Sequence, residues 1–167
     1  MKNIKSNIVL IGMPGSGKST VGVILAKMTA RDFVDTDVLI QTFKNKRLQD
    51  IVDTGGHIAL RAIEEQVILG LSVKNHVIAT GGSAVYSDSA MNHLKSDGTV
   101  IFLDVDFDEI SKRLGDFSSR GIAKRPDQSL EELFEERFNL YTRNADITIQ
   151  CGRINQDAVC RKIMNAT

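Results

Sequence analysis

The feature that most constrains this chain is the stretch at residues 12–20, which reads GMPGSGKST and matches the pattern G-x-x-x-x-G-K-S. An apolar run at residues 8–11 precedes it, and apolar residues at helical spacing follow it. A strand, a glycine-rich loop and a helix in this order are the setting of a phosphate-binding P-loop. The stretch therefore predicts a nucleoside triphosphate site.

The chemistry of this loop assigns roles to its residues. Glycines let the backbone wrap closely around phosphate oxygens, and the helix that follows adds unpaired N–H groups and the positive end of its dipole. We expect Lys18 to reach the β- and γ-phosphates and the Ser19 hydroxyl to bind Mg²⁺. The expected nucleotide-binding residues of the loop are Gly12, Gly15, Ser16, Gly17, Lys18, Ser19 and Thr20.

Composition narrows the class of protein. Lysine plus arginine equal aspartate plus glutamate at 21 each, which argues against nucleic acid as a partner because such proteins usually have a basic surplus. No apolar run is long enough to span a bilayer. Cys151 and Cys160 make no disulfide framework, and residues 1–7 leave no room for a signal peptide. We therefore expect a cytoplasmic protein with no membrane partner.

Apolar runs of strand length alternate with segments of helical periodicity along the whole chain. After the first strand we expect strands at residues 33–37, 76–80, 99–105 and 147–149. The expected helices are residues 17–28, 38–52, 58–71, 90–95, 109–114, 130–141 and 158–164, with an interruption at 54–56. This alternation predicts one α/β domain over residues 1–167, with a parallel sheet covered on both faces by helices.

Two carboxylates follow the second apolar run. Asp35 and Asp37 are expected on one short strand, two residues apart, so that both side chains leave the same face at the carboxyl end of the sheet. A kinase needs one carboxylate to help hold Mg²⁺ and another to orient or deprotonate the attacking hydroxyl. The pair therefore favours phosphoryl transfer over nucleotide binding alone.

Six short motifs follow one another at a characteristic spacing, at residues 12–20, 35–37, 61–64, 81–82, 125–126 and 137–141. Together they make the chain similar to the shikimate kinase family over nearly its whole length. The resemblance implies a three-layer α/β/α P-loop NTPase fold with a five-stranded parallel sheet in the order 2-3-1-4-5. It also implies a monomer that uses ATP and Mg²⁺ to phosphorylate the 3-hydroxyl of shikimate, in the pathway to chorismate and the aromatic amino acids.

The same resemblance implies roles for the acceptor-side residues. Asp35 matches the residue that approaches Mg²⁺, and Asp37 matches the one that binds shikimate hydroxyls and acts as base. Arg61 and Arg137 match the arginines that bind the substrate carboxylate, a task suited to planar guanidinium groups. The expected substrate-binding set is Asp37, Arg61, Glu64, Gly81, Gly82 and Arg137, with residues 35–64 as the substrate-binding segment.

The loop at about residues 114–127 is similar to the mobile lid of the family, which closes over ATP. Closure would bring Arg120 or Arg125 onto the phosphates and exclude water. Arg125 has the better motif match, so it joins Lys18 and Asp37 as an expected catalytic residue.

The chain departs from the family pattern near the acceptor. Ser83 stands where a third glycine is usual, and we expect its side chain to crowd or re-decorate the ring site. Val52 and Leu60 replace larger phenylalanines, and residues 56–57 and 127 also differ. Two alternatives therefore stay open: a kinase for another small hydroxy acid, of the gluconate type, and a nucleotide-binding module without catalysis. A nucleoside monophosphate kinase is disfavoured because no base-recognition pattern is present.

Overall fold

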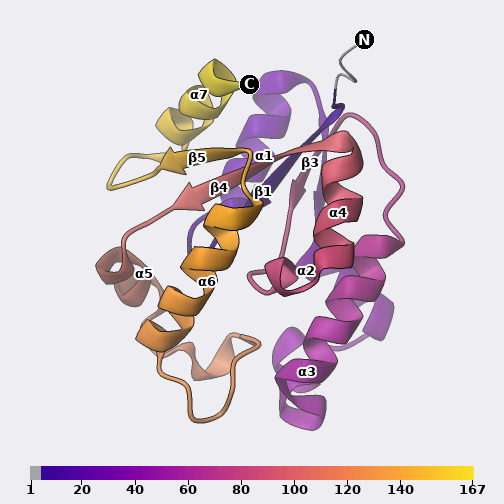
Figure 1. The fold of residues 1–167 in the computed structure, drawn as a ribbon, viewed down its shortest axis with the longest axis vertical. Coiled ribbons are helices and arrows are strands. Elements are labelled where there is room, and N and C mark those ends of the chain that lie inside the picture. Colours follow the sequence, from indigo (N-terminus) through magenta and orange to yellow (C-terminus); the bar gives the residue numbers. More distant parts are fainter. Residues whose placement is uncertain (1–4) are drawn as a thin grey trace.

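A computed structural model describes residues 5–167 of the chain. Five strands form one parallel sheet in the order β2-β3-β1-β4-β5 (Figure 1), which confirms the predicted fold. The strands are β1 (Asn7–Ile11), β2 (Asp32–Asp35), β3 (His76–Ala79), β4 (Gly98–Asp104) and β5 (Ile147–Gln150). The predicted domain also includes residues 1–4, which lie outside the described residues.

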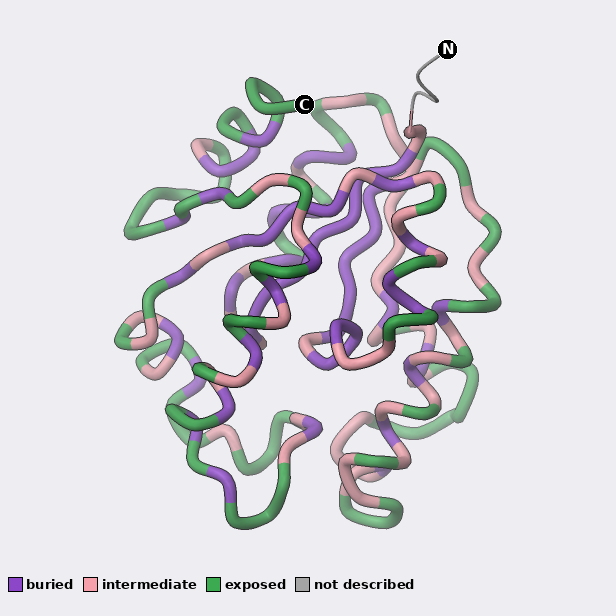
Figure 2. Tube along the Cα trace, viewed as in Figure 1, coloured by how far each residue is buried: buried purple, intermediate pink, exposed green. Residues whose placement is uncertain are grey.

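The central strand explains why the first apolar run is continuous and does not alternate. Val9, Leu10 and Ile11 are completely buried, since helices cover both faces of β1. Val9 pairs in register with Ile78 on one side and Val100 on the other. Figure 2 shows β1 and most of β3 and β4 as the buried centre of the molecule, with exposed residues on the outer surfaces of the helices.

Helices form a layer on each side of the sheet. One layer contains α1 (Lys18–Thr29) and α7 (Gln156–Ala166), which pack against each other. The other contains α4 (Asp88–Asp97) and α6 (Leu130–Asn144), which both contact β4 (Figure 1). Across residues 5–167, none of the helices has the length and apolar character needed to cross a membrane.

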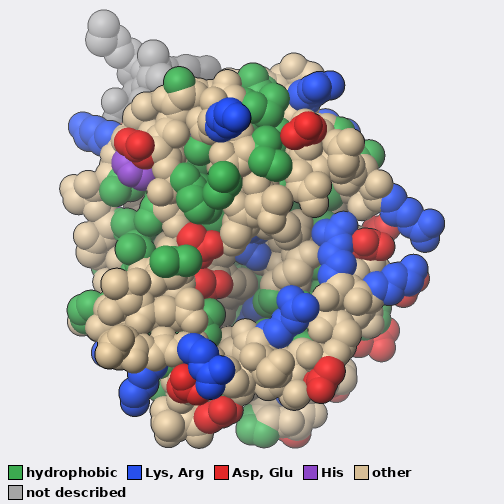
Figure 3. Space-filling model, turned by 180° about the vertical axis from the view of Figure 1, so that it is seen from behind, with side chains coloured by type: hydrophobic (Ala, Val, Ile, Leu, Met, Phe, Trp, Pro, Cys, Tyr) green, Lys and Arg blue, Asp and Glu red, His purple; other side chains and the backbone are tan. Residues whose placement is uncertain are grey.

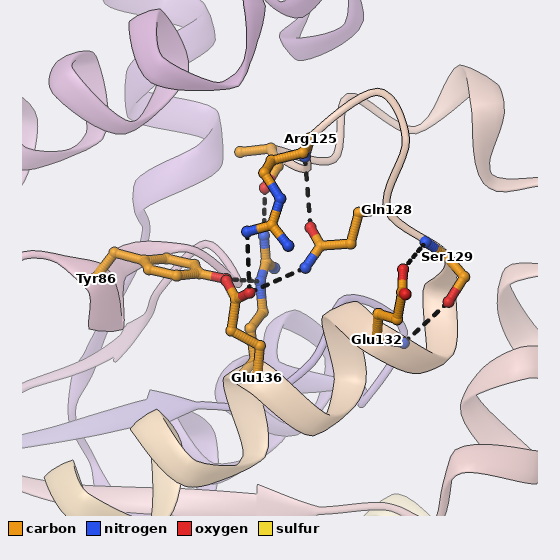
Figure 4. A network of polar contacts seen from close by, with 8 residues as sticks. Tyr86, Arg125, Gln128, Ser129, Glu132 and Glu136 are labelled. Atoms are coloured by element: carbon orange, nitrogen blue, oxygen red, sulfur yellow. Dashed lines mark hydrogen bonds and ion pairs between the residues drawn. The ribbon is translucent and has the colours of Figure 1, made fainter.

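The remaining helical segments complete the chain. They are α2 (Thr36–Lys44), α3 (Leu48–Leu69), α5 (Phe107–Leu114) and the short 3₁₀ turns η1 (Ala84–Tyr86) and η2 (Phe117–Ser119). The interruption expected at residues 54–56 is confirmed as a kink in α3, where Gly56 has φ 75°. The loop between α5 and α6 ends at Ser129, which begins α6 with a capping box to Glu132 (Figure 4).

Two expectations for the segment after α1 are wrong. The strand ends at Asp35, and Asp37 lies in the first turn of α2, so the two carboxylates do not share a strand face. The reason is that Asp35 is the N-cap: its Oδ1 accepts from the backbone N–H of Asp37 at 2.9 Å, which satisfies a free donor of the helix. The single helix expected at residues 38–52 is also divided, because Asn45 adopts a left-handed conformation (φ 49°) that ends α2.

Candidate active site

The lysine of the P-loop is buried and bonds to the backbone of its own loop. Gly17 immediately precedes α1 and has φ 90°, a backbone conformation that residues with a side chain rarely adopt. It therefore allows the chain to turn directly into the helix. Lys18 is 8% exposed, and its Nζ donates to the backbone oxygens of Gly12 at 2.7 Å and Met13 at 2.8 Å. Burial lowers the pKa of Lys18 to about 8, although the nearby carboxylate of Asp37 opposes this change.

The two residues predicted to hold Mg²⁺ lie together. The Ser19 hydroxyl donates to Oδ2 of Asp35, whose other oxygen caps α2. A hydroxyl and a carboxylate are hard oxygen ligands of the kind that Mg²⁺ prefers. Within residues 5–167 there is no group of three or more His, Cys, Asp and Glu that could hold a metal ion. A protein pair completed by phosphate oxygens and water is the usual way in which Mg²⁺ is bound with a nucleotide, so these residues fit the ion.

A cavity of about 350 Å³ begins at the P-loop and extends toward α3. The loop after β3 and the segment at residues 120–123 form its other walls. On the face opposite that of Figure 1 the surface is hollowed, with basic and acidic side chains gathered around the hollow (Figure 3). The lining includes Lys18, Ser19, Thr20, Asp37, Leu60, Glu64, Gly81, Gly82, Ser83, Arg120 and Arg137. The cavity thus joins the predicted nucleotide site to most of the predicted acceptor site.

Two carboxylates flank a glycine on the acceptor side of this cavity. A Cβ atom at Gly81 would lie too close to Oε1 of Glu64 and 2.7 Å from Oδ1 of Asp37, so a larger residue there would displace both carboxylates. Burial and the charge of Asp35 raise the pKa of Asp37 to about 6. Burial and the charge of Asp37 raise the pKa of Glu64 to about 7. Carboxyl groups with such pKa values are suited to proton transfer near neutral pH.

Of the two effects expected of Ser83, crowding or re-decorating the ring site, its contacts in the structure correspond to the second. It is buried, and its hydroxyl donates to Oε2 of Glu64, while Oε1 of Glu64 has no hydrogen-bond partner. Leu60 lines the main cavity as expected. Val52 instead lies with His57 in an adjoining cavity of about 390 Å³. Ser83 therefore forms a hydrogen bond with a carboxylate of the site. Of the two smaller apolar residues, only Leu60 borders the cavity next to the P-loop.

The two predicted carboxylate-binding arginines have different surroundings. Arg137 is 1% exposed, and one of its terminal nitrogens donates to the backbone oxygen of Ala123 at 2.6 Å. Arg61 is not part of the main cavity wall. Its guanidinium carbon lies 3.5 Å from the centre of the Tyr86 ring, and its Nε is buried without a hydrogen-bond partner. Tyr86 could not be identified from the sequence, since a tyrosine after a glycine-rich loop has no motif of its own.

The lid arginines also differ from each other. Arg120 lines the main cavity and donates to the backbone oxygen of Arg113 at 3.1 Å. Arg125 is half-exposed and pairs with Glu136 at 3.2 Å (Figure 4). Arg125 would have to leave this pair to reach a phosphate, and its role at the nucleotide stays a prediction.

The geometry is that of a P-loop phosphotransferase with a small, charged acceptor site. A family model described as shikimate kinase matches residues 14–167. The chain belongs to the shikimate kinase family. Its curated relatives include shikimate kinase of Rippkaea orientalis, 40% identical over 95% of this chain and 84% of the relative. Shikimate kinase of Aquifex aeolicus is 36% identical over 94% of this chain and 93% of the relative.

Solved structures agree with this membership. Shikimate kinase from Acinetobacter baumannii in complex with shikimate has a TM-score of 0.89 at 29% identity, covering 98% of this chain and 93% of that one. Shikimate kinase from Aquifex aeolicus has a TM-score of 0.82 at 35% identity, covering 96% and 95%. A gluconokinase from Sinorhizobium meliloti has a TM-score of 0.51 at 16% identity, which is a likeness of fold alone. The chain is therefore a P-loop kinase of the shikimate kinase family.

Proposed function

We propose that this chain transfers the γ-phosphoryl group of ATP to the 3-hydroxyl of shikimate, giving shikimate 3-phosphate and ADP. The observation that carries the proposal is the single cavity with the P-loop at one end and Asp37, Glu64 and Arg137 at the other. A small carboxylated polyol suits this end, because the acids can accept hydrogen bonds from hydroxyls and a guanidinium can bind a carboxylate. The similarity to a shikimate kinase solved with shikimate supports the same acceptor.

In the proposed mechanism, each residue has a separate task. Lys18 exchanges the carbonyls of Gly12 and Met13 for phosphate oxygens and offsets their charge. Asp37 orients the acceptor hydroxyl and accepts its proton as the oxygen forms a bond to the γ-phosphorus and ADP leaves. Arg137 and Arg61 bind the acceptor carboxylate. Mg²⁺, held at Ser19 and Asp35, would supply charge neutralisation at the phosphates.

Glu64 and Ser83 form the second part of the acceptor site. Glu64 lines the cavity, and its Oε1 is buried beside Gly81 without a hydrogen-bond partner. We propose that a substrate hydroxyl provides the missing hydrogen bond when the acceptor binds. The backbone of Gly81 and Gly82 approaches the ring of the substrate. The Ser83 hydroxyl fixes the other oxygen of Glu64, so this substitution is compatible with shikimate as acceptor.

The proposal extends to the loop at residues 114–127 as a mobile lid. In the structure this loop already contacts the acceptor side through the bond between Ala123 and Arg137. Closure over ATP would move Arg120 from the Arg113 carbonyl toward the phosphates. We further propose that residues 1–167 act as one kinase domain with residues 35–64 as its substrate-binding segment. We place it in the cytoplasm as a monomer whose only partners are small molecules, and the balanced charge fits the absence of a nucleic acid partner.

A coupled ADP-release assay with ATP and Mg²⁺ tests the proposal, using shikimate, gluconate and a nucleoside monophosphate as separate acceptors. We expect release that depends on shikimate and stays at background with the other two. Release that depends on gluconate, or ATP binding with no acceptor-dependent release, would contradict the proposed substrate and leave only the P-loop kinase fold.

A further inference from the structure

Tyr86, the last residue of η1, contacts both arginines of the acceptor site. The guanidinium carbon of Arg61 lies 3.5 Å from the centre of its ring, and that of Arg137 lies 5.4 Å away. The Tyr86 hydroxyl accepts from Nε of Arg137 at 3.4 Å and donates to Oε1 of Glu136 at 2.6 Å (Figure 4). One side chain therefore touches two cations and one carboxylate.

The two arginines that contact the Tyr86 ring carry the same charge. Two guanidinium groups close to one ring repel each other, and the pKa of Arg61 is lowered by burial and by the charge of Arg137. Within the described residues no ion pair joins Arg61 to a carboxylate. The face of the Tyr86 ring carries negative potential and attracts a cation, most strongly where water is excluded. The ring is thus the contact that holds Arg61 beside Arg137.

The hydroxyl links Arg137 to the loop before α6. Glu136 binds Tyr86 through one oxygen, and through the other it accepts from Arg125 at 3.2 Å and Gln128 at 3.0 Å. Figure 4 shows these side chains converging on Glu136 from the loop and from η1. The phenol therefore orients Glu136 for its contacts with the loop, in addition to accepting from Arg137.

We propose that Tyr86 is a positioning residue for acceptor recognition: its ring orients Arg61 next to Arg137, and its hydroxyl connects Arg137 to the loop through Glu136. The inference rests on the proposed function, because it takes the ligand of the two arginines to be the carboxylate of a small hydroxy acid. Tyr86 itself need not touch the substrate. A residue that served only packing would affect both substrates equally.

The test compares Tyr86→Leu, which removes the ring and the hydroxyl, with Tyr86→Phe, which keeps the ring. Met164→Ala is the control, since it also shortens a partly exposed apolar side chain (41% exposed) and lies on α7, outside the segments assigned to the site. We expect Tyr86→Leu to raise the KM for shikimate about tenfold, with the KM for ATP changed about twofold or less. Tyr86→Phe should recover most of this loss, and Met164→Ala should match the wild type.

A second readout requires no acceptor. In ¹⁵N-labelled protein, the side-chain Nε–H signal of Arg61, assigned with Arg61→Lys, should be displaced by the ring current of Tyr86. We expect Tyr86→Phe to keep this displacement and Tyr86→Leu to abolish it. An unchanged signal in Tyr86→Leu, or equal losses for shikimate and ATP, would overturn the inference. A wild-type protein inactive on shikimate would instead contradict the proposed function, while the signal of Arg61 still decides whether Tyr86 positions it.

Discussion

At the scale of single residues, the charges of the site are set by burial more than by pairing. Lys18 satisfies its ammonium group with loop carbonyls, and Asp37 and Glu64 face each other across Gly81 with few neutralising contacts. Burial is accordingly the largest cause of the change in pKa for each of the three. Buried groups of this kind are suited to binding a charged ligand, because the ligand would supply the hydrogen bonds and opposite charges that the protein does not provide.

Lys18→Met should remove most of the turnover and leave the fold intact, because methionine fills a similar volume but cannot offset phosphate charge. We expect kcat to fall by at least about 100-fold, the scale seen when one charge-stabilising group is removed from a transition state. Lys27→Met, an exposed lysine at the end of α1, is the control. Activity of Lys18→Met within a few-fold of wild type would show that this lysine does not contact the phosphates.

The acid limb of the pH profile should report Asp37. Its pKa of about 6 means that the carboxylate becomes protonated below that pH and can no longer accept the hydroxyl proton. At saturating ATP, kcat/KM for shikimate should fall as the pH decreases through about 6. The acid limb should persist in Glu64→Gln, because this variant removes the titration of Glu64 and leaves that of Asp37. A flat profile down to pH 5 would contradict the base role.

At the scale of elements, the structure shows a contact that the sequence did not predict, between the proposed lid and α3. The backbone N–H of Gly121 donates to Oε1 of Gln49 at 2.7 Å, so the segment rests against the first turn of α3. A Cβ atom at Gly121 would lie 2.5 Å from the Cβ of Leu48. The proposed lid therefore touches the first turn of α3, within the proposed substrate-binding segment, so closure over ATP would act on both ligand sites.

Gly121→Ala should impair this contact. Gly115→Ala is the matched control, because Gly115 has a similar positive φ (52°, against 62° for Gly121) but has open space, with no atom within 4 Å, where an alanine Cβ would lie. Both variants carry strain of about 1 kcal/mol from the positive φ, and only Gly121→Ala adds a clash. We expect a loss of about tenfold in kcat/KM for ATP in Gly121→Ala beyond that of Gly115→Ala. Steady-state kinetics measure both, and equal losses would show that the contact has no role in closure.

The sequence predicted correctly those elements whose formation is governed by a single physical rule. Buried strands such as β1 and β4 were evident as apolar runs, and the P-loop was evident from its spacing. Asp37 was misplaced because two rules competed: the apolar run before Asp35 and the two-residue spacing of the carboxylates favoured a strand through Asp37, while the N-cap preference of Asp35 favoured a helix start. Capping prevailed because it satisfies donors that an extended strand end would leave to solvent.

At the scale of the whole molecule, the sequence also predicted which segments meet at the cavity. Parallel strands place their carboxyl ends at one edge, so Lys18, Asp37 and Gly81 could be grouped before the structure was known. The contacts of Tyr86 and of Ser83 could not be, because they depend on side-chain directions across segments far apart in the chain. Spacing within a sequence contains no information on such contacts.

The site should lower the stability of the whole protein at neutral pH. The pKa values of Asp37 and Glu64 are raised in the folded state, so folding favours their protonated forms. Their contribution is therefore most favourable below the unfolded pKa values and is lost as pH rises through about 6 and 7. Asp37→Asn and Glu64→Gln should each raise the free energy of unfolding at pH 7.5 by on the order of 1 kcal/mol.

Urea unfolding at pH 4.5 and pH 7.5 measures this effect. The gain should be smaller at pH 4.5, where the wild-type carboxyl groups are mostly protonated when folded. Asp37→Asn should lose activity as it gains stability, as expected of a group selected for chemistry. Variants less stable than wild type at pH 7.5 would show that the carboxylates are stabilised by partners in the folded protein.

The position of the transferred phosphoryl group tests the account most directly. The protein is incubated with ATP, Mg²⁺ and shikimate, and the product is examined by ³¹P–¹H correlation NMR. We predict a cross-peak between the new phosphorus signal and the proton on carbon 3 of the shikimate ring, absent in Lys18→Met. Phosphorus correlated with a different ring proton, or only inorganic phosphate beside unmodified shikimate, would contradict the proposed transfer.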